Sequence, residues 1–158
     1  MTAANLGSGT TPSYVADAAT GRLAIGGHEI GDTGWRNVNA NLENGWTTPG
    51  VWMIRRTGDM VSIGVEYNNL DASAATSNRF YTIPTGFRSL GYVHAVAGVA
   101  DASLYGLIRI DGVSDHGIVL LTPVYTGQPV VRPSASWPTK DPWPTVLPGS
   151  EFTAPGPG

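Results

Sequence analysis

The chain contains no cysteine and few charged residues. A disulfide framework and a thiolate metal site are therefore excluded for its 158 residues. Charged residues make up 13% of the sequence, against a usual level of roughly 25%. No apolar run approaches the roughly 18 residues of a membrane span, and Met1-Thr2-Ala3-Ala4 does not begin a signal peptide. We expect neither membrane insertion nor export by an ordinary signal.

Sequence signatures of catalysis, metal binding and nucleic-acid binding are also missing. There is no Gly-x-Ser-x-Gly elbow, no phosphate-binding loop and no His-Glu-x-x-His. His28, His94 and His116 lie far apart with no partner spacing, so we expect no metal site. The net charge of −3 argues against a nucleic-acid binder, which usually carries a basic patch. We therefore expect a protein that is not an enzyme and needs no cofactor.

Glycine and proline are abundant instead. The chain has 21 glycines and 12 prolines, and such frequent turns with little charge are typical of short strands in an all-β domain. Either a sandwich or a barrel fits this composition, and we expect an antiparallel β-sandwich of jelly-roll-like form over residues 31–150. Residues 1–30 are small, polar and weakly patterned apart from one short strand at 22–25, so we expect an extended N-terminal arm that is either disordered or laid along another surface. Residues 151–158 are expected to form a flexible tail.

The clearest single element is a hairpin over residues 51–68. Two alternating runs flank Gly58-Asp59, and glycine at the first central position suits a type II′ turn. The three pairs expected on the core face are Trp52–Val65, Ile54–Ile63 and Arg56–Val61. That face is apolar except at its turn end, where the arginine lies.

Further strands follow from alternation and from proline. Strands are predicted at 79–83, 92–100 and 102–110, and the last of these returns through a hairpin loop at 111–115 into 116–122. Extended pieces at 130–131 and 134–137 lie among prolines, so we expect them at sheet edges or rims. No helix longer than two turns is expected.

Loops and tryptophans supply the candidate ligand-binding residues. Loop tips carry function more often than strands do, so the loops at 69–78 and 111–115 are the candidate contact regions. Trp46 lies in a loop beside Asn44 and Gly45 and could hold a sugar face or simply anchor that loop. The candidate ligand-binding residues are Trp46, Asn69, Asp71, Asp111 and Asp115. The last two could be read as an acid/base pair, but turn formation is the better explanation.

Several segments resemble a known family. The segments are Gly-Trp-Arg-Asn-Val at 34–38, Asn-Gly-Trp at 44–46, Arg-Arg-Thr-Gly-Asp-Met-Val at 55–61, Ile-Pro-Thr-Gly-Phe-Arg at 83–88 and Trp-Pro-Thr-Lys-Asp-Pro-Trp-Pro-Thr-Val-Leu-Pro-Gly at 137–149. They resemble the C-terminal head domains of minor tail proteins and tail fibres of phages that infect actinobacteria. The resemblance spans residues 32–149, and the ending with two Trp-Pro-Thr units is its most specific part.

The resemblance implies a β-sandwich head, usually trimeric, that is displayed on the virion and touches the host surface. The expected function is therefore host-surface binding by a tail or tail-fibre head, with envelope glycan as the ligand. The alternative is a purely structural virion protein, a capsid decoration, head-fibre or tail-tip component. In either case the resemblance implies that residues 1–30 are an attachment arm that contacts other virion proteins. An envelope-degrading hydrolase is disfavoured, since no acid/base pair is evident.

Overall fold

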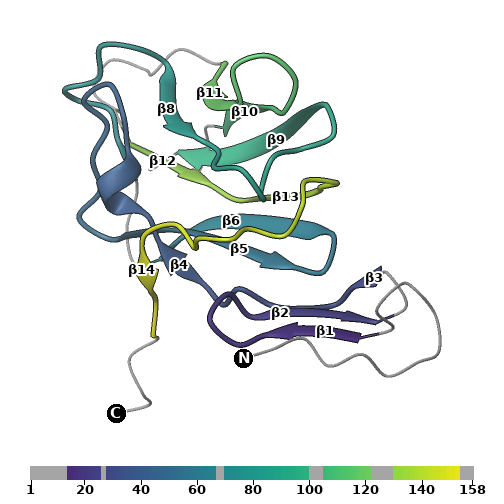
Figure 1. Cartoon of the computed structure of the whole chain (residues 1–158). Coiled ribbons are helices and arrows are strands. Elements are labelled where there is room, and N and C mark those ends of the chain that lie inside the picture. Colours follow the sequence, from purple (N-terminus) through teal and green to yellow (C-terminus); the bar gives the residue numbers. More distant parts are fainter. Residues whose placement is uncertain (1–13, 26–27, 67–69, 100–104, 122–129, 154–158) are drawn as a thin grey trace.

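A computed structural model of the chain describes residues 14–25, 28–66, 70–99, 105–121 and 130–153. These residues form three antiparallel sheets and one 3-10 turn, η1 (Asn39–Asn41) (Figure 1). Within these ranges there is no α-helix, which confirms the all-β class. Accordingly, the described part of the chain contains no helix with the length and apolar character to cross a membrane.

The central hairpin has the register that its sequence predicts. β5 (Val51–Thr57) pairs with β6 (Met60–Glu66), and all three expected cross-strand pairs are present. Gly58 has a φ of 55°, whereas Asp59 has no positive φ. A positive φ at the first central position alone is the combination that a type II′ turn requires. The expected turn chemistry therefore sets the pairing of the two strands.

This hairpin forms the middle of a five-stranded sheet in the order β13-β6-β5-β4-β14. The other members are β4 (Arg36–Asn37), β13 (Ala135–Pro138) and β14 (Ser150–Glu151). β13 carries a proline and lies at an edge, as expected. β14 includes Glu151, the residue at which the flexible C-terminal tail is expected to begin. Phe152 N–H extends the pairing by donating to Trp35 O at 2.9 Å.

The second large sheet has the order β7-β12-β9-β10-β11-β8. Its strands are β7 (Leu70–Asp71), β8 (Arg79–Thr82), β9 (Tyr92–Val99), β10 (Tyr105–Asp111), β11 (Gly117–Leu120) and β12 (Val130–Pro133). β10 and β11 form the predicted hairpin. The edge position expected for β12 is wrong, because β7 and β9 pair with it on its two sides. Its proline is the last residue of the strand, where a missing N–H costs little.

The segment at 69–78, expected to be surface loop, begins with a short strand instead. β7 pairs with β12, and the Leu70 side chain is fully buried. A single leucine among Asp, Ser, Ala and Thr gives no periodic signal, so only tertiary pairing reveals this strand.

The two large sheets pack against each other as the predicted β-sandwich (Figure 1). Trp52 lies at the centre of the interior, and its ring meets those of Phe80 and Tyr81 edge-on, each at 5.7 Å between centroids. Trp137 enters the core from β13, and its Nε1–H donates to Phe87 O at 2.8 Å. Alternation along β9 exposes Tyr92, His94 and Val96 and turns the intervening side chains inward.

A third, small sheet lies beneath the β5–β6 hairpin (Figure 1). It consists of β1 (Tyr14–Asp17), β2 (Arg22–Ile25) and β3 (His28–Glu29) in sequence order. Gly58 N–H donates to Gly31 O at 2.8 Å, and Thr33 N–H donates to Arg56 O at 3.0 Å. Residues assigned from sequence to the attachment arm thus form a sheet joined to the turn end of the hairpin. Residues 1–13 of that arm lie outside the described residues.

Candidate functional site

Trp46, one candidate ligand-binding residue, is an internal anchor of its loop. It is only 3% exposed, and its ring packs on Phe80 with 5.2 Å between centroids. Its Nε1–H donates to Ser77 O at 2.8 Å. The indole therefore ties the loop at 43–47 to the start of β8.

Asp71 and Asp115 both stabilise the backbone around them. Asp71 accepts the N–H of Ser73 at 2.7 Å, and this backbone hydrogen bond lowers the pKa of Asp71. Asp115 accepts the N–H of Gly117 at 3.0 Å and lies 3.6 Å from the Arg79 guanidinium. Asn69 lies outside the described residues.

Asp111 is buried beneath the β10–β11 loop, with 1% exposure. Its carboxylate accepts the backbone N–H groups of Val113 and Ser114 at 2.9 and 3.0 Å, and the Ser114 hydroxyl at 2.6 Å. Burial raises the pKa of this group, but the hydrogen bonds outweigh it and bring the pKa of Asp111 to about 2. Asp111 and Asp115 share one loop, and both use their acceptors to shape it.

The depressed pKa of Asp111 predicts acid sensitivity. A folded-state pKa below the ordinary 3.8 contributes stability that is present above about pH 4 and is lost as the pH falls towards about 2. We expect the melting temperature of the wild type to fall over this range, and that of the Asp111→Asn variant to fall less steeply. Thermal melts followed by circular dichroism between about pH 5 and about pH 2 measure both slopes. Identical slopes for the two proteins would contradict this role.

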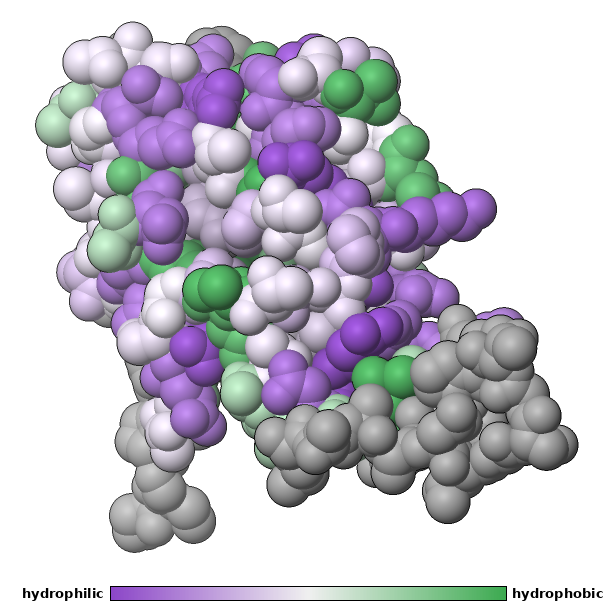
Figure 2. Space-filling view, viewed as in Figure 1, coloured by the Kyte–Doolittle hydropathy of each residue, from purple (hydrophilic) through white to green (hydrophobic). Residues whose placement is uncertain are grey.

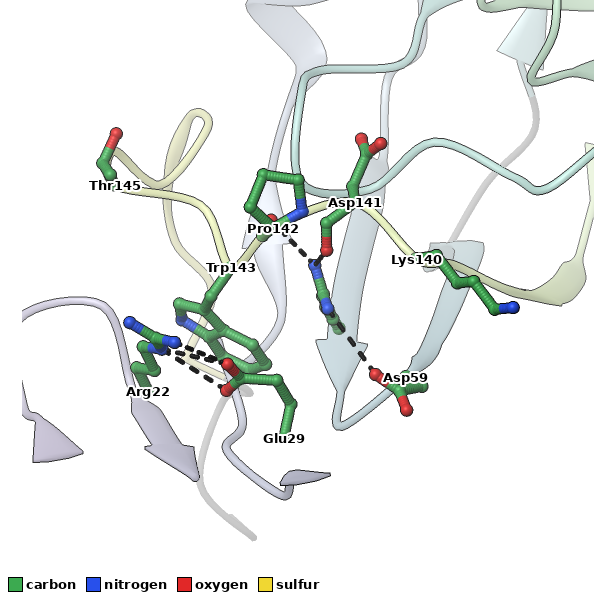
Figure 3. A pocket seen from close by; sticks show the side chains of 9 residues that line it. Arg22, Glu29, Asp59, Lys140, Asp141, Pro142, Trp143 and Thr145 are labelled. Atoms are coloured by element: carbon green, nitrogen blue, oxygen red, sulfur yellow. Dashed lines mark hydrogen bonds and ion pairs between the residues drawn. The ribbon is translucent and has the colours of Figure 1, made fainter. Parts of the chain in front are cut away.

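A different place brings functional side chains together, the junction between the small sheet and the sandwich. The junction cleft, as we name it, has a volume of about 570 Å³. Its lining residues come from β2, β3, the β5–β6 turn and the proline-rich segment after β13 (Figure 3). They are Arg22, Glu29, Arg56, Asp59, Lys140, Asp141, Pro142, Trp143 and Thr145. None of the four candidate residues that the structure describes, Trp46, Asp71, Asp111 and Asp115, lines it. Figure 2 shows hydrophilic residues gathered where the small sheet meets the sandwich.

Arg56 holds the cleft together from within, although it is charged and only 1% exposed. Four carbonyl groups accept from its guanidinium: Gly58 O at 2.8 Å from Nε, and Gly86, Asp141 and Pro142 O at 2.6, 3.0 and 3.1 Å from Nη1. Burial lowers the pKa of this guanidinium. A planar fork with several donors suits this role. Arg56 therefore joins the hairpin turn, the β8–β9 connection and the C-terminal segment.

Trp143 connects this arginine to the small sheet. The Arg56 guanidinium lies 4.8 Å from the centre of the indole ring, within cation–π range. On the other side, Trp143 Nε1–H donates to Thr20 O at 3.2 Å. The tryptophan is 6% exposed, so its role is to fix the cleft wall rather than to offer a broad open face.

The rim of the cleft alternates donors and acceptors. Arg22 and Glu29 pair across β2 and β3 at 2.7 Å, with a second contact from Nε at 3.1 Å. Asp59 is 67% exposed and lies 3.8 Å from Arg56 Nη2. Lys140 is exposed beside it (Figure 3). The cations Arg22, Arg56 and Lys140 thus face three carboxylates, so the cleft carries no net charge.

Two carboxylates of the cleft are already engaged by neighbouring groups. Glu29 is engaged by Arg22, and Asp141 accepts the N–H groups of Gly86 and Arg88 at 2.8 and 3.3 Å. Across the part of the chain that is described, no three His, Cys, Asp or Glu side chains form a metal-binding group. The polar groups that remain can donate to and accept from a ligand rich in hydroxyls.

Sequence reasoning misses most of this site. Its one local signal is Arg56, a charge on the otherwise apolar core face of the hairpin. Asp59 lies in the same turn as Arg56. The other lining residues form two groups, at 22–29 and 140–145, each more than 25 positions from Arg56, and only the fold brings them to this turn.

Comparison with known proteins gives no relative: neither a protein-family model nor a curated protein matches this chain.

Proposed function

We propose that this chain is a non-enzymatic head of a phage virion protein that binds a host-surface glycan in the junction cleft. The observation that supports this most is the cleft itself, in which paired cations and carboxylates surround a rigid Arg56–Trp143 unit. The resemblance at 32–149 supports the virion setting, with the protein displayed on the phage tail or capsid surface.

The chemistry of the cleft favours a neutral glycan. A sugar hydroxyl can donate to a carboxylate and accept from a cation at the same time. Adjacent groups such as Asp59 and Lys140 offer both. A polyanionic ligand would meet the carboxylates of Glu29 and Asp59 as well as the cations Arg22 and Lys140, so it gains little from charge. The volume falls within the roughly 300–1,000 Å³ of small-ligand sites.

Weak single sites are compatible with strong adhesion in this proposal. A trimer, and many heads on one virion, would bind one envelope through several sites at once, and linked sites raise overall avidity without any new contact. The N-terminal part of the chain would connect the head to other virion proteins.

A purely structural virion role is the alternative, and one observation favours it. Among the described residues β1 pairs only with β2, so its outer edge can accept a strand from a neighbouring protein. In that case the small sheet would be an assembly element, and the cleft would have no ligand.

The test is binding of the full chain to neutral polysaccharide purified from actinobacterial cell walls. Lys140→Ala and Arg22→Ala should each weaken binding by about tenfold or more, because each removes a charged hydrogen-bond donor worth about 1.5–3 kcal/mol. Arg132→Ala is the matched control, since Arg132 is exposed on β12 and lies outside the cleft lining. Affinity should change little with added salt, as expected for a neutral ligand.

Two outcomes would count against the proposal. Absence of binding by the wild type, with the fold verified by circular dichroism, would leave the structural alternative. Binding that both cleft variants retain in full would place the glycan elsewhere on the head.

A further inference from the structure

A second hollow adjoins the junction cleft and differs from it in chemistry. It has a volume of about 340 Å³ and shares Pro142, Trp143 and Thr145 with the cleft. The rest of its lining is Pro84, Thr85, Pro144 and Val146. Six charged side chains line the cleft, whereas this apolar hollow, as we name it, has none.

The walls of the apolar hollow are fixed before any ligand arrives. Gly86 lies so close to Pro144 that an added Cβ would be 2.8 Å from the proline ring. The Asp141 carboxylate binds the backbone of the β8–β9 connection, and Trp143 is held by Thr20. Prolines and these bonds leave little conformational freedom to lose on binding. Val146, at the rim, is 80% exposed.

We propose, on the basis of the glycan-binding function above, that the apolar hollow receives a methyl-bearing substituent of the same glycan, such as an N-acetyl group. A sugar ring in the cleft presents hydroxyls to charged groups. A substituent that crosses the shared Pro142–Thr145 border meets no charged side chain, but three prolines, a valine, a tryptophan and two threonines. Burying one methyl group is worth about fourfold in affinity. The hollow therefore selects between sugars that differ only in this substituent.

The size of the selectivity follows from the same argument. An apolar pocket discriminates one small group by about 10-fold and rarely by more than about 200-fold. We therefore expect a preference of about fourfold to tenfold for the substituted sugar, with the main affinity still supplied by the cleft.

An array of matched neutral oligosaccharides tests this directly. It would carry oligomers of glucose beside N-acetylglucosamine, and of galactose beside N-acetylgalactosamine, of equal length. The wild type should prefer the acetylated member of a pair, and Val146→Asp should lower binding of that member to the level of its partner. Val113→Asp is the control, because Val113 is also exposed, at 60%, and lies in the β10–β11 loop.

The outcomes separate the two proposals. Equal binding of both members of each pair by the wild type would overturn the role of the hollow and leave glycan binding intact. A preference that Val146→Asp retains would also overturn it. If the wild type binds neither the array nor the wall polysaccharide, the proposed function fails, and the role of the hollow fails with it.

Discussion

Arg56→Ala should destabilise the protein by about 3 kcal/mol or more, the largest effect expected of any exchange at the site. The change leaves four carbonyl groups without their donor and removes the cation–π contact to Trp143. Each buried acceptor left unpaired costs about 1–3 kcal/mol, and water from the cleft can restore part of this. Urea unfolding followed by tryptophan fluorescence measures the loss.

Arg55→Ala provides a matched control at the next position. Arg55 points to the other face of β5, is about one-third exposed and pairs with Asp32. An exposed pair of this kind contributes about 1 kcal/mol or less. Arg56→Lys adds a second check of the hydrogen bonds. It keeps the positive charge, but the lysine ammonium lacks the planar fork with which arginine reaches all four acceptors. Equal losses for Arg55→Ala and Arg56→Ala would contradict the structural role of Arg56.

Truncation of Trp52 to alanine should cost about 3–5 kcal/mol, because it empties the middle of the sandwich. The side chain is fully buried and touches two aromatic rings. Its Nε1–H has no hydrogen-bond partner among the described residues, so Trp52→Phe removes an unpaired donor together with part of the ring.

Trp137→Phe is the informative comparison for that exchange. Trp137 is equally buried, but its Nε1–H donates to Phe87 O, and phenylalanine would leave that carbonyl unpaired. Trp137→Phe should therefore cost more than Trp52→Phe by about 1 kcal/mol. Chemical denaturation of the four proteins, including Trp52→Ala, gives the differences. A larger loss for Trp52→Phe would contradict the hydrogen-bond assignment.

Local rules predict the strands of this protein well. Alternation and the Gly58-Asp59 turn are properties of adjacent residues, and they are sufficient for the register of β5 and β6. The same holds for the strand at 22–25 and for the β10–β11 hairpin. β7 and the internal position of β12 depend on pairing between segments about 60 residues apart, for which a short sequence window holds no signal.

The candidate site depends on long-range placement even more. From sequence, the loops at 69–78 and 111–115 are the candidate contact regions because loop tips carry function more often than strands do. In the structure Asp71, Asp111 and Asp115 use those polar groups to build the turns themselves. The cleft instead joins Arg22 and Glu29 to residues near 56 and 140. Its N-terminal wall belongs to the segment that the sequence predicts to be an arm, so in our proposal ligand binding and attachment would share one junction.

Hydrogen–deuterium exchange of the full chain, with and without neutral wall polysaccharide, tests the central claim most directly. The account predicts slower exchange on binding at β2, the β5–β6 turn and residues 140–146, and unchanged exchange at 73–78 and 111–116. Protection confined to those two loops, with none at the junction of the small sheet and the sandwich, would contradict it.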